Sequence, residues 1–293
     1  MALIEKGRLK MSHANSTEAD YWNSESGHQW IAQETFLDAT MAGILVLLLE
    51  RTDIRPNENL LDIGCGTGAS TLAAAIKTGP AGHVTGLDIA AQLLNRARKR
   101  SDDAGLRNTS FIQADAQTYS FIPDSFDAVI SRFGLMFFDN PVAAFANMAR
   151  GLKPHGRLVF AAWGPAAGNP WFTIPRDAAM ARLGKPAPGD PFAPGPLAFQ
   201  DLERVTKLME QAGLKGVRGE TEMVELTPHV SAAKAAKSAI RIGPAARIIR
   251  EFSGTEVDAA AIETAITEAF SKFETGNGIS VPATINFFSA EKT

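Results

Sequence analysis

Residues 60–68 read Leu-Leu-Asp-Ile-Gly-Cys-Gly-Thr-Gly, an apolar strand that runs directly into a loop with glycine at every second position. From Ala69 the composition favours a helix. Glycine lets the backbone approach a ligand closely, and the first turn of a helix offers N–H groups without an intrahelical partner. The segment is therefore typical of a site that binds a nucleotide or nucleoside.

The remainder of the chain repeats this strand-and-helix order. Expected strands cover residues 59–63, 83–88, 109–114, 126–131, 157–162, 217–226 and 278–289, and expected helices cover residues 30–50, 67–78, 90–104, 141–152, 176–183 and 199–212. Residues 231–273 are expected to be helical, with interruptions at Gly243-Pro244 and Ser253-Gly254, and Lys153–Gly156 is expected to be a turn. A βαβα order implies a parallel sheet with helices on both faces and right-handed crossovers.

Charge and cysteine content exclude several classes of protein. The net charge of -3 gives no electrostatic reason to expect nucleic acid as a partner. The single cysteine, Cys65, excludes an intrachain disulfide and fits a reducing compartment. The apolar run at residues 44–49 is too short to span a bilayer, and no signal peptide is evident. We expect a cytoplasmic protein without a membrane or nucleic-acid partner, whose oligomeric state is unknown.

The glycine loop is compatible with two cofactors. Gly64, Gly66 and Ala69 satisfy the relaxed dinucleotide fingerprint G-x-G-x-x-G/A. Asp62, however, precedes the first glycine, and a carboxylate there suits an ammonium group and repels a pyrophosphate. S-adenosylmethionine carries such an ammonium together with a ribose and an adenine. With Gly68, the pattern Asp-x-Gly-x-Gly-x-Gly resembles the first motif of the class I S-adenosylmethionine-dependent methyltransferases.

This resemblance implies a fold and a division of the chain. The fold is α/β: a Rossmann-like seven-stranded sheet in the order 3-2-1-4-5-7-6, with strand 7 antiparallel, N-terminal helices and a helical cap insertion. Residues 1–58 are expected to form an N-terminal helical lid segment, and residues 59–293 the methyltransferase domain. Cap insertions are expected at about 164–198 and 229–277.

Two further strand ends carry carboxylates in the order that the family requires. Asp88 closes the second strand, where the family binds both ribose hydroxyls, and Ile89 would flank the adenine. Asp115 follows the third strand, where the family accepts a hydrogen bond from the adenine amino group beside a backbone N–H, here that of Ala116. Each aspartate also has a local interpretation, Asp88 as a helix N-cap and Asp115 as a turn residue.

The fourth strand ends in Ser131-Arg132-Phe133-Gly134, which faces the reacting methyl group in the family's fold. It lacks the Asn/Asp-Pro-Pro-Tyr/Phe signature of enzymes that methylate base amines or glutamine. It resembles the small-molecule branch, which includes quinone-biosynthesis methyltransferases. Ser131 would contact the cofactor through its backbone. Arg132 would bind an acidic group of the substrate or form an ion pair at the sheet edge, and Phe133 would line the pocket or pack in the core.

Aromatic residues outside these motifs have two interpretations each. Tyr21 and Trp30 precede the core fold, where the family often folds a segment over the cofactor, and either could give the sulfonium a cation–π contact or be a plain hydrophobic anchor. Trp171 lies in the first insertion and is expected to line a mostly apolar substrate pocket. Cys65 is interpreted as a small residue that fits a tight turn, with nucleophilic catalysis as the alternative.

Other polar residues offer no competing chemistry. The five histidines are scattered without metal-ligand spacing, so we expect no metal site. His155 and His229 are the histidines nearest the expected site, but neither is assigned as a general base. The basic cluster at residues 96–100 is interpreted as a solvated helix face rather than a nucleic-acid patch.

The expected activity is methyl transfer from S-adenosylmethionine, with S-adenosylhomocysteine as product, to a small and largely apolar organic molecule. Such an in-line displacement depends mainly on alignment, so the absence of an assignable catalytic side chain is not an obstacle. Two alternatives stay open at this point: an NAD(P)-dependent oxidoreductase, and a non-catalytic protein that binds S-adenosylmethionine.

Overall fold

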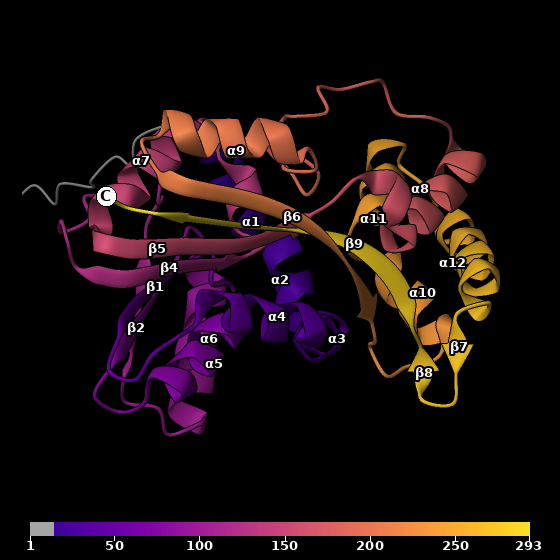
Figure 1. The fold of residues 1–293 in the computed structure, drawn as a ribbon. Helices are drawn as coiled ribbons and strands as arrows, with labels where there is room; N and C mark the ends of the chain where they lie inside the picture. Colours follow the sequence, from indigo (N-terminus) through magenta and orange to yellow (C-terminus); the bar gives the residue numbers. More distant parts are fainter. Residues whose placement is uncertain (1–14) are drawn as a thin grey trace, which may run out of the picture.

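A computed structural model describes residues 15–293, and its centre is one mixed sheet of seven strands (Figure 1). The strand order is β3-β2-β1-β4-β5-β9-β6, and β9 is antiparallel to both of its neighbours. This confirms the predicted order, with β9 as the seventh strand. The strands are β1 (Asn59–Ile63), β2 (His83–Asp88), β3 (Thr109–Gln113), β4 (Phe126–Arg132), β5 (Leu152–Trp163), β6 (Lys215–Leu226) and β9 (Val281–Glu291).

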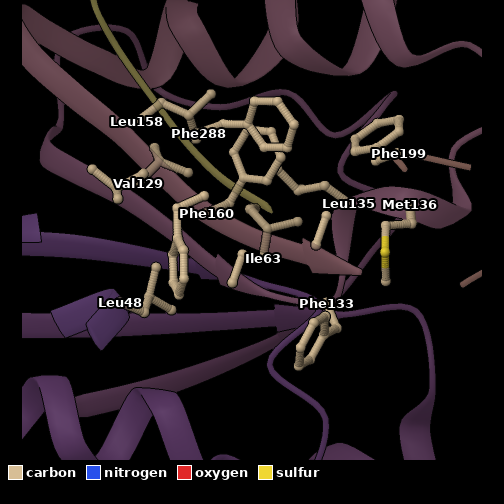
Figure 2. Close-up of a cluster of buried hydrophobic side chains, with 14 of the residues drawn as sticks. Leu48, Ile63, Val129, Phe133, Leu135, Met136, Leu158, Phe160, Phe199 and Phe288 are labelled. Atoms are coloured by element: carbon tan, nitrogen blue, oxygen red, sulfur yellow. The ribbon is translucent and has the colours of Figure 1, made fainter. Parts of the chain in front are cut away.

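Helices cover both faces of the sheet, as the buried central strands require. In Figure 1, α4, α5 and α6 lie on one face and α7 and α9 on the other. These helices are α4 (Ala42–Thr52), α5 (Ala69–Thr78), α6 (Ala91–Asp103), α7 (Pro141–Gly151) and α9 (Leu202–Gln211). Val129, Leu158 and Phe160 of the central strands pack with Phe288 of β9 in the main core (Figure 2).

A second group of helices lies beside the sheet, in the region where the cap is expected (Figure 1). It consists of α8 (Pro170–Leu183), α10 (Ala232–Ala239), α11 (Pro244–Glu251) and α12 (Glu256–Ser271), followed by a small hairpin of β7 (Glu274–Thr275) and β8 (Gly278–Ile279). Ala179, Ile248, Ile266 and Phe270 belong to a hydrophobic cluster that these helices share, apart from the main core. The division into lid, domain and cap insertions remains a prediction.

The N-terminal helices differ from the single helix expected over residues 30–50. The segment contains α1 (Ser16–Trp22), α2 (Glu25–Ala32), α3 (Glu34–Thr40) and α4. Gln33 and Met41 interrupt the helix with φ near -101° and ψ of 8° and 13°. Neither residue is a helix breaker, so the pattern carried no signal for these two bends. The bends result from tertiary packing. Helix α3 brings Glu34 and Asp38 to ion-pair partners on α6, while α4 packs Ile44 and Leu48 into the main core.

Three other elements differ from their expected boundaries. The strand β5 begins at Leu152 rather than Arg157, because the expected turn lies inside it. His155 has φ +61°, and the pairing of β4 with β5 shifts register between Phe126 and Ala128. Helix α8 begins at Pro170 rather than at Arg176, with Pro175 inside it. A two-residue strand, β8, precedes β9, where a single continuous strand was expected.

Candidate cofactor site

The glycine loop between β1 and α5 requires glycine for steric reasons. Gly64, Gly66 and Gly68 have φ of +64°, +55° and +89°, a region that disfavours any residue with a Cβ atom. A Cβ atom on Gly64 would also lie 2.6 Å from Cα of Gly134 in the loop after β4. Gly68 is the N-cap of α5, so the loop ends at an open helix N terminus.

Asp62 lies at the end of β1, fully buried beneath this loop. Its Oδ2 accepts hydrogen bonds from the hydroxyls of Ser70 and Thr71, at 2.7 and 2.6 Å, whereas its Oδ1 has no partner among residues 15–293. Burial raises the pKa of Asp62 to about 6, against the two hydroxyls and the positive charge of Arg132, which lower it.

Asp88 ends β2 and holds the glycine loop in place. Its Oδ2 accepts from the backbone N–H of Gly66 at 2.8 Å, and its Oδ1 from that of Ala90 at 2.9 Å. Burial raises the pKa of Asp88, although these N–H groups oppose the shift. Both oxygens keep a lone pair for a ligand. Ile89 is half-buried next to it, and its carbonyl accepts from the Asn23 amide.

Asp115 lies in the loop after β3, with one oxygen used and the other free. Its Oδ1 accepts from the backbone N–H of Gln117 at 2.8 Å and from Nδ2 of Asn15 at 2.9 Å. Its Oδ2 is buried and has no partner in the described part of the chain. The neighbouring Ala116 is buried, and its carbonyl accepts from the side chain of Asn147.

Unpartnered buried atoms gather around this site. Within residues 15–293 the buried side-chain polar atoms without a hydrogen-bond partner are Asp62 Oδ1, Asp115 Oδ2, Arg132 Nη1 and Gln29 Oε1. Each such atom costs about 1–3 kcal/mol unless a ligand or water completes it. The first three belong to residues at the carboxyl ends of β1, β3 and β4, where open α/β sheets bind ligands. Two carboxylate oxygens and one guanidinium nitrogen match a ligand with two N–H groups and an anion.

Residues 60–156 match a family model described as "Methyltransferase domain". These residues form a methyltransferase domain. The match begins in β1 and ends in β5, so it contains the glycine loop together with Asp62, Asp88 and Asp115. The family resemblance drawn from the motifs is confirmed, and the dinucleotide interpretation of the loop gains no support.

Curated relatives match about a third of the chain. An aklanonic acid methyltransferase from Streptomyces sp. strain C5 is 43% identical over 103 residues, 35% of this chain and 47% of that protein. A demethylmenaquinone methyltransferase from Listeria welshimeri is 36% identical over 105 residues, 36% of this chain and 44% of that protein. The chain thus matches less than half the length of these relatives.

A solved structure extends the likeness to the fold as a whole. It is phosphoethanolamine N-methyltransferase 2 of Haemonchus contortus in complex with S-adenosyl-L-methionine, with a TM-score of 0.50 and 18% identity. The alignment covers 85% of this chain and 52% of that one. At this identity the likeness concerns the fold alone.

Aromatic residues of the N-terminal helices lie against the methyltransferase domain. Trp30 is next to the glycine loop, because a Cβ atom on Gly66 would lie 4.0 Å from its Nε1. Trp22 packs edge-on against Trp30 and against Phe137 of the loop after β4. Tyr21 packs on Trp22 but is 41% exposed. Contact of Tyr21 or Trp30 with a cofactor remains a prediction, for which Trp30 has the better position.

Ser131 and Arg132, at the end of β4, have different partners. The Ser131 hydroxyl donates to the carbonyl of Ile63 at 2.7 Å and accepts from the N–H of Gly134, which ties the two site loops together. Arg132 Nη2 lies 3.5 Å from Asp38 of α3, so the expected ion pair at the sheet edge exists. Burial lowers the pKa of Arg132, against the charges of Asp38 and Asp62.

The two remaining candidate substrate residues lie in different aromatic groups. Phe133 has φ +65° and stacks on Trp163 with ring centroids 4.5 Å apart. Trp171 stacks between Phe36 of α3 and Phe270 of α12. Phe133 therefore lies at the end of the sheet, and Trp171 joins the cap to the N-terminal helices. Their contact with a substrate remains a prediction.

The basic cluster on α6 has a structural role that the sequence interpretation missed. Arg96 forms a bidentate pair with Glu34, whose side chain is 9% exposed, and Arg100 pairs with Asp38 at 2.7 Å. The interpretation as a solvated face is therefore wrong for Arg96 and Arg100. These two arginines hold α3 against α6, and the reason is long-range pairing that the local pattern of α6 cannot reveal.

Cys65 behaves as a small residue of the turn. It is buried, and burial raises the pKa of its thiol well above the ordinary value, so the thiolate that a nucleophile requires is disfavoured. Residues that the motifs did not indicate are Asn15, Gln29 and Asp38, all from the N-terminal segment. Their only signal in the sequence was polarity in a segment expected to cover the cofactor.

In the described part of the chain no group of three or more His, Cys, Asp or Glu side chains could hold a metal ion. None of the helices between residues 15 and 293 is long and apolar enough to cross a membrane.

Proposed function

We propose that this chain transfers the methyl group of S-adenosylmethionine to a small, largely apolar organic molecule. The observation that carries the proposal is the set of unpartnered buried atoms on Asp62, Asp115 and Arg132. S-adenosylmethionine presents an ammonium group, an exocyclic adenine amine and a carboxylate, which are the groups that these atoms can pair with.

Each carboxylate would bind a different part of the cofactor. Asp88 would accept the ribose hydroxyls on the lone pairs that Gly66 and Ala90 leave free. Asp115 would accept the adenine amine, beside the N–H of Ala116 and with Ile89 against the ring. The backbone of the glycine loop, including Cys65, and the backbone of Ser131 would lie along the amino-acid end.

Arg132 is best assigned to the cofactor rather than to an acid group of the substrate. The register pairs Asp62 with Ile130, so Arg132, two residues further along β4, is on the same face of the sheet as Asp62. A guanidinium and a carboxylate on one face, each with an unpartnered buried atom, complement the two charges of an α-amino acid. This assignment replaces the substrate role expected from the residue type alone.

The cofactor would supply a methyl group on a positively charged sulfur. The chain's own residues bind and orient the reactants and exclude water, and alignment of this kind contributes up to about 7–11 kcal/mol in the best model systems. Phe133, Trp163 and Phe172 form an aromatic face that suits an apolar acceptor. Trp171 of the cap is the proposed residue on the opposite wall.

Titration calorimetry with S-adenosylhomocysteine and with NAD tests the proposal. We expect binding of S-adenosylhomocysteine and none of NAD, and the reverse result would contradict the proposal. Incubation with methyl-labelled cofactor and a set of apolar phenols, quinols and acids then tests catalysis. Tight binding without label transfer to any of them would favour the non-catalytic alternative.

A further inference from the structure

Asn15 bridges two loops at the adenine end of the site. It is 6% exposed and precedes α1. Its Nδ2 donates to Oδ1 of Asp115 at 2.9 Å, and its Oδ1 accepts from the backbone N–H of Asp139 at 2.8 Å. The loop after β3 and the loop after β4 are therefore joined through one side chain of the N-terminal segment.

The orientation of this amide is determined by its partners. A backbone N–H can only donate, and an ionised carboxylate can only accept, so the Asn15 amide cannot be flipped without losing both bonds. Asp115 Oδ1 receives two hydrogen bonds, from Asn15 and from the N–H of Gln117. The carboxylate is thereby held with Oδ2 buried and, among the described residues, without a hydrogen-bond partner, so that it can accept from a ligand.

We propose that Asn15 is a positioning residue that sets the cofactor's base specificity. It holds Asp115 so that Oδ2 meets a ligand N–H donor, which selects a purine with an exocyclic amine over one with a carbonyl. The inference rests on the proposed function, because it assumes that Asp115 faces the adenine. If the Asp115 carboxylate could rotate, the protein would discriminate less between the two purines. The carboxylate would then turn away from the carbonyl oxygen of the wrong ligand, and the repulsion that excludes this ligand would be lost.

The test compares S-adenosylhomocysteine with S-inosylhomocysteine, in which a carbonyl replaces the amine, by calorimetry. We expect the wild-type protein to prefer the adenine ligand by at least about tenfold, because the inosine ligand leaves a buried acceptor unpaired. Asn15→Ala should lower the affinity for the adenine ligand by about tenfold and the affinity for the inosine ligand by much less. Asn15→Asp keeps the bond to Asp139 but loses the donor to Asp115, and should reduce selectivity in the same way.

Asn23→Ala is the matched control. Asn23 belongs to the same segment and forms hydrogen bonds with the backbone of Ile89 and Ala91, but among the described residues it has none with Asp115. This variant should weaken both ligands by the same factor. Equal losses for both ligands in Asn15→Ala and Asn15→Asp would overturn the inference. Absence of S-adenosylhomocysteine binding in the wild-type protein would instead overturn the proposed function.

Discussion

Asp62 and Arg132 lie at the ends of adjacent strands, on one face of the sheet, and each has a buried side-chain atom without a hydrogen-bond partner in the described structure, residues 15–293. Their charges lower the free energy of each other's ionised form, yet no hydrogen bond joins them. A buried pair of opposite charges that is left apart is costly unless a ligand fits between its members. This geometry makes the amino-acid end of the cofactor separately testable.

Arg132→Gln and Asp62→Asn should each weaken the binding of S-adenosylhomocysteine, because each removes a charge-assisted hydrogen bond to the ligand. Such a bond is worth about 1.5–3 kcal/mol, which corresponds to roughly 10- to 100-fold in affinity. Both variants should leave 5′-methylthioadenosine nearly unaffected, since this ligand has neither the ammonium nor the carboxylate. Calorimetry with the two ligands measures the difference. Equal losses for both ligands would contradict the assignment.

Asp88→Ala should lower the affinity for S-adenosylhomocysteine and for 5′-methylthioadenosine by the same factor, because both ligands carry the ribose. The expected loss is at least about 100-fold, since the change also releases Gly66 from its hydrogen bond to the carboxylate. Asp88→Asn, which keeps an acceptor for Gly66, should lose less. Unchanged affinity in the alanine variant would refute the ribose assignment.

The free energy of unfolding of the ligand-free protein should decrease as the pH rises from 4 to 6, because Asp62 loses its proton. Its folded-state pKa of about 6 lies above the ordinary value of 3.8, so the folded state binds the proton more tightly than the unfolded state does. The stabilisation by the protonated form is fully present below about pH 4 and is lost as the pH rises through 6, a change of roughly 3 kcal/mol.

Chemical denaturation of the wild-type protein and of Asp62→Asn measures this pH contribution as a difference between the two curves. The difference isolates Asp62 from Asp88, whose pKa is also raised by burial. Bound S-adenosylhomocysteine should reverse the effect, because its ammonium favours the ionised carboxylate. Parallel curves for the two proteins without ligand would show that Asp62 titrates normally.

Glu34→Gln should release α3 from α6 and lower the free energy of unfolding by about 1–2 kcal/mol, because it breaks the charge-assisted bidentate pair with Arg96, whose side chain is 33% exposed. Glu203→Gln, which breaks the exposed pair with Lys207, should leave the free energy of unfolding nearly unchanged. Thermal or denaturant unfolding measures both. Limited proteolysis in the N-terminal segment should accelerate for Glu34→Gln alone, and equal behaviour of the two variants would contradict the proposed clamp.

Most of the sheet and the three carboxylates could be predicted because their signals are local. A continuous apolar strand, a glycine at a left-handed position and an acidic residue at a strand end are each determined within a few residues. The chain order of such elements then leaves few topologies, because crossovers are right-handed. The antiparallel seventh strand followed from the family resemblance, since nothing in β9 itself specifies its direction.

The tertiary structure alone decided how the N-terminal segment completes the site. Asn15 and Asp115 are 100 residues apart, and Glu34 and Arg96 are 62 apart, so no local pattern couples them. No glycine or proline marks the bends at Gln33 and Met41 in the sequence. They arise because α3 and α4 pack against different partners. The sequence by itself determined the strand-end chemistry, whereas long-range pairing of buried polar groups determined which oxygen of Asp115 is free and where Arg132 lies relative to Asp62.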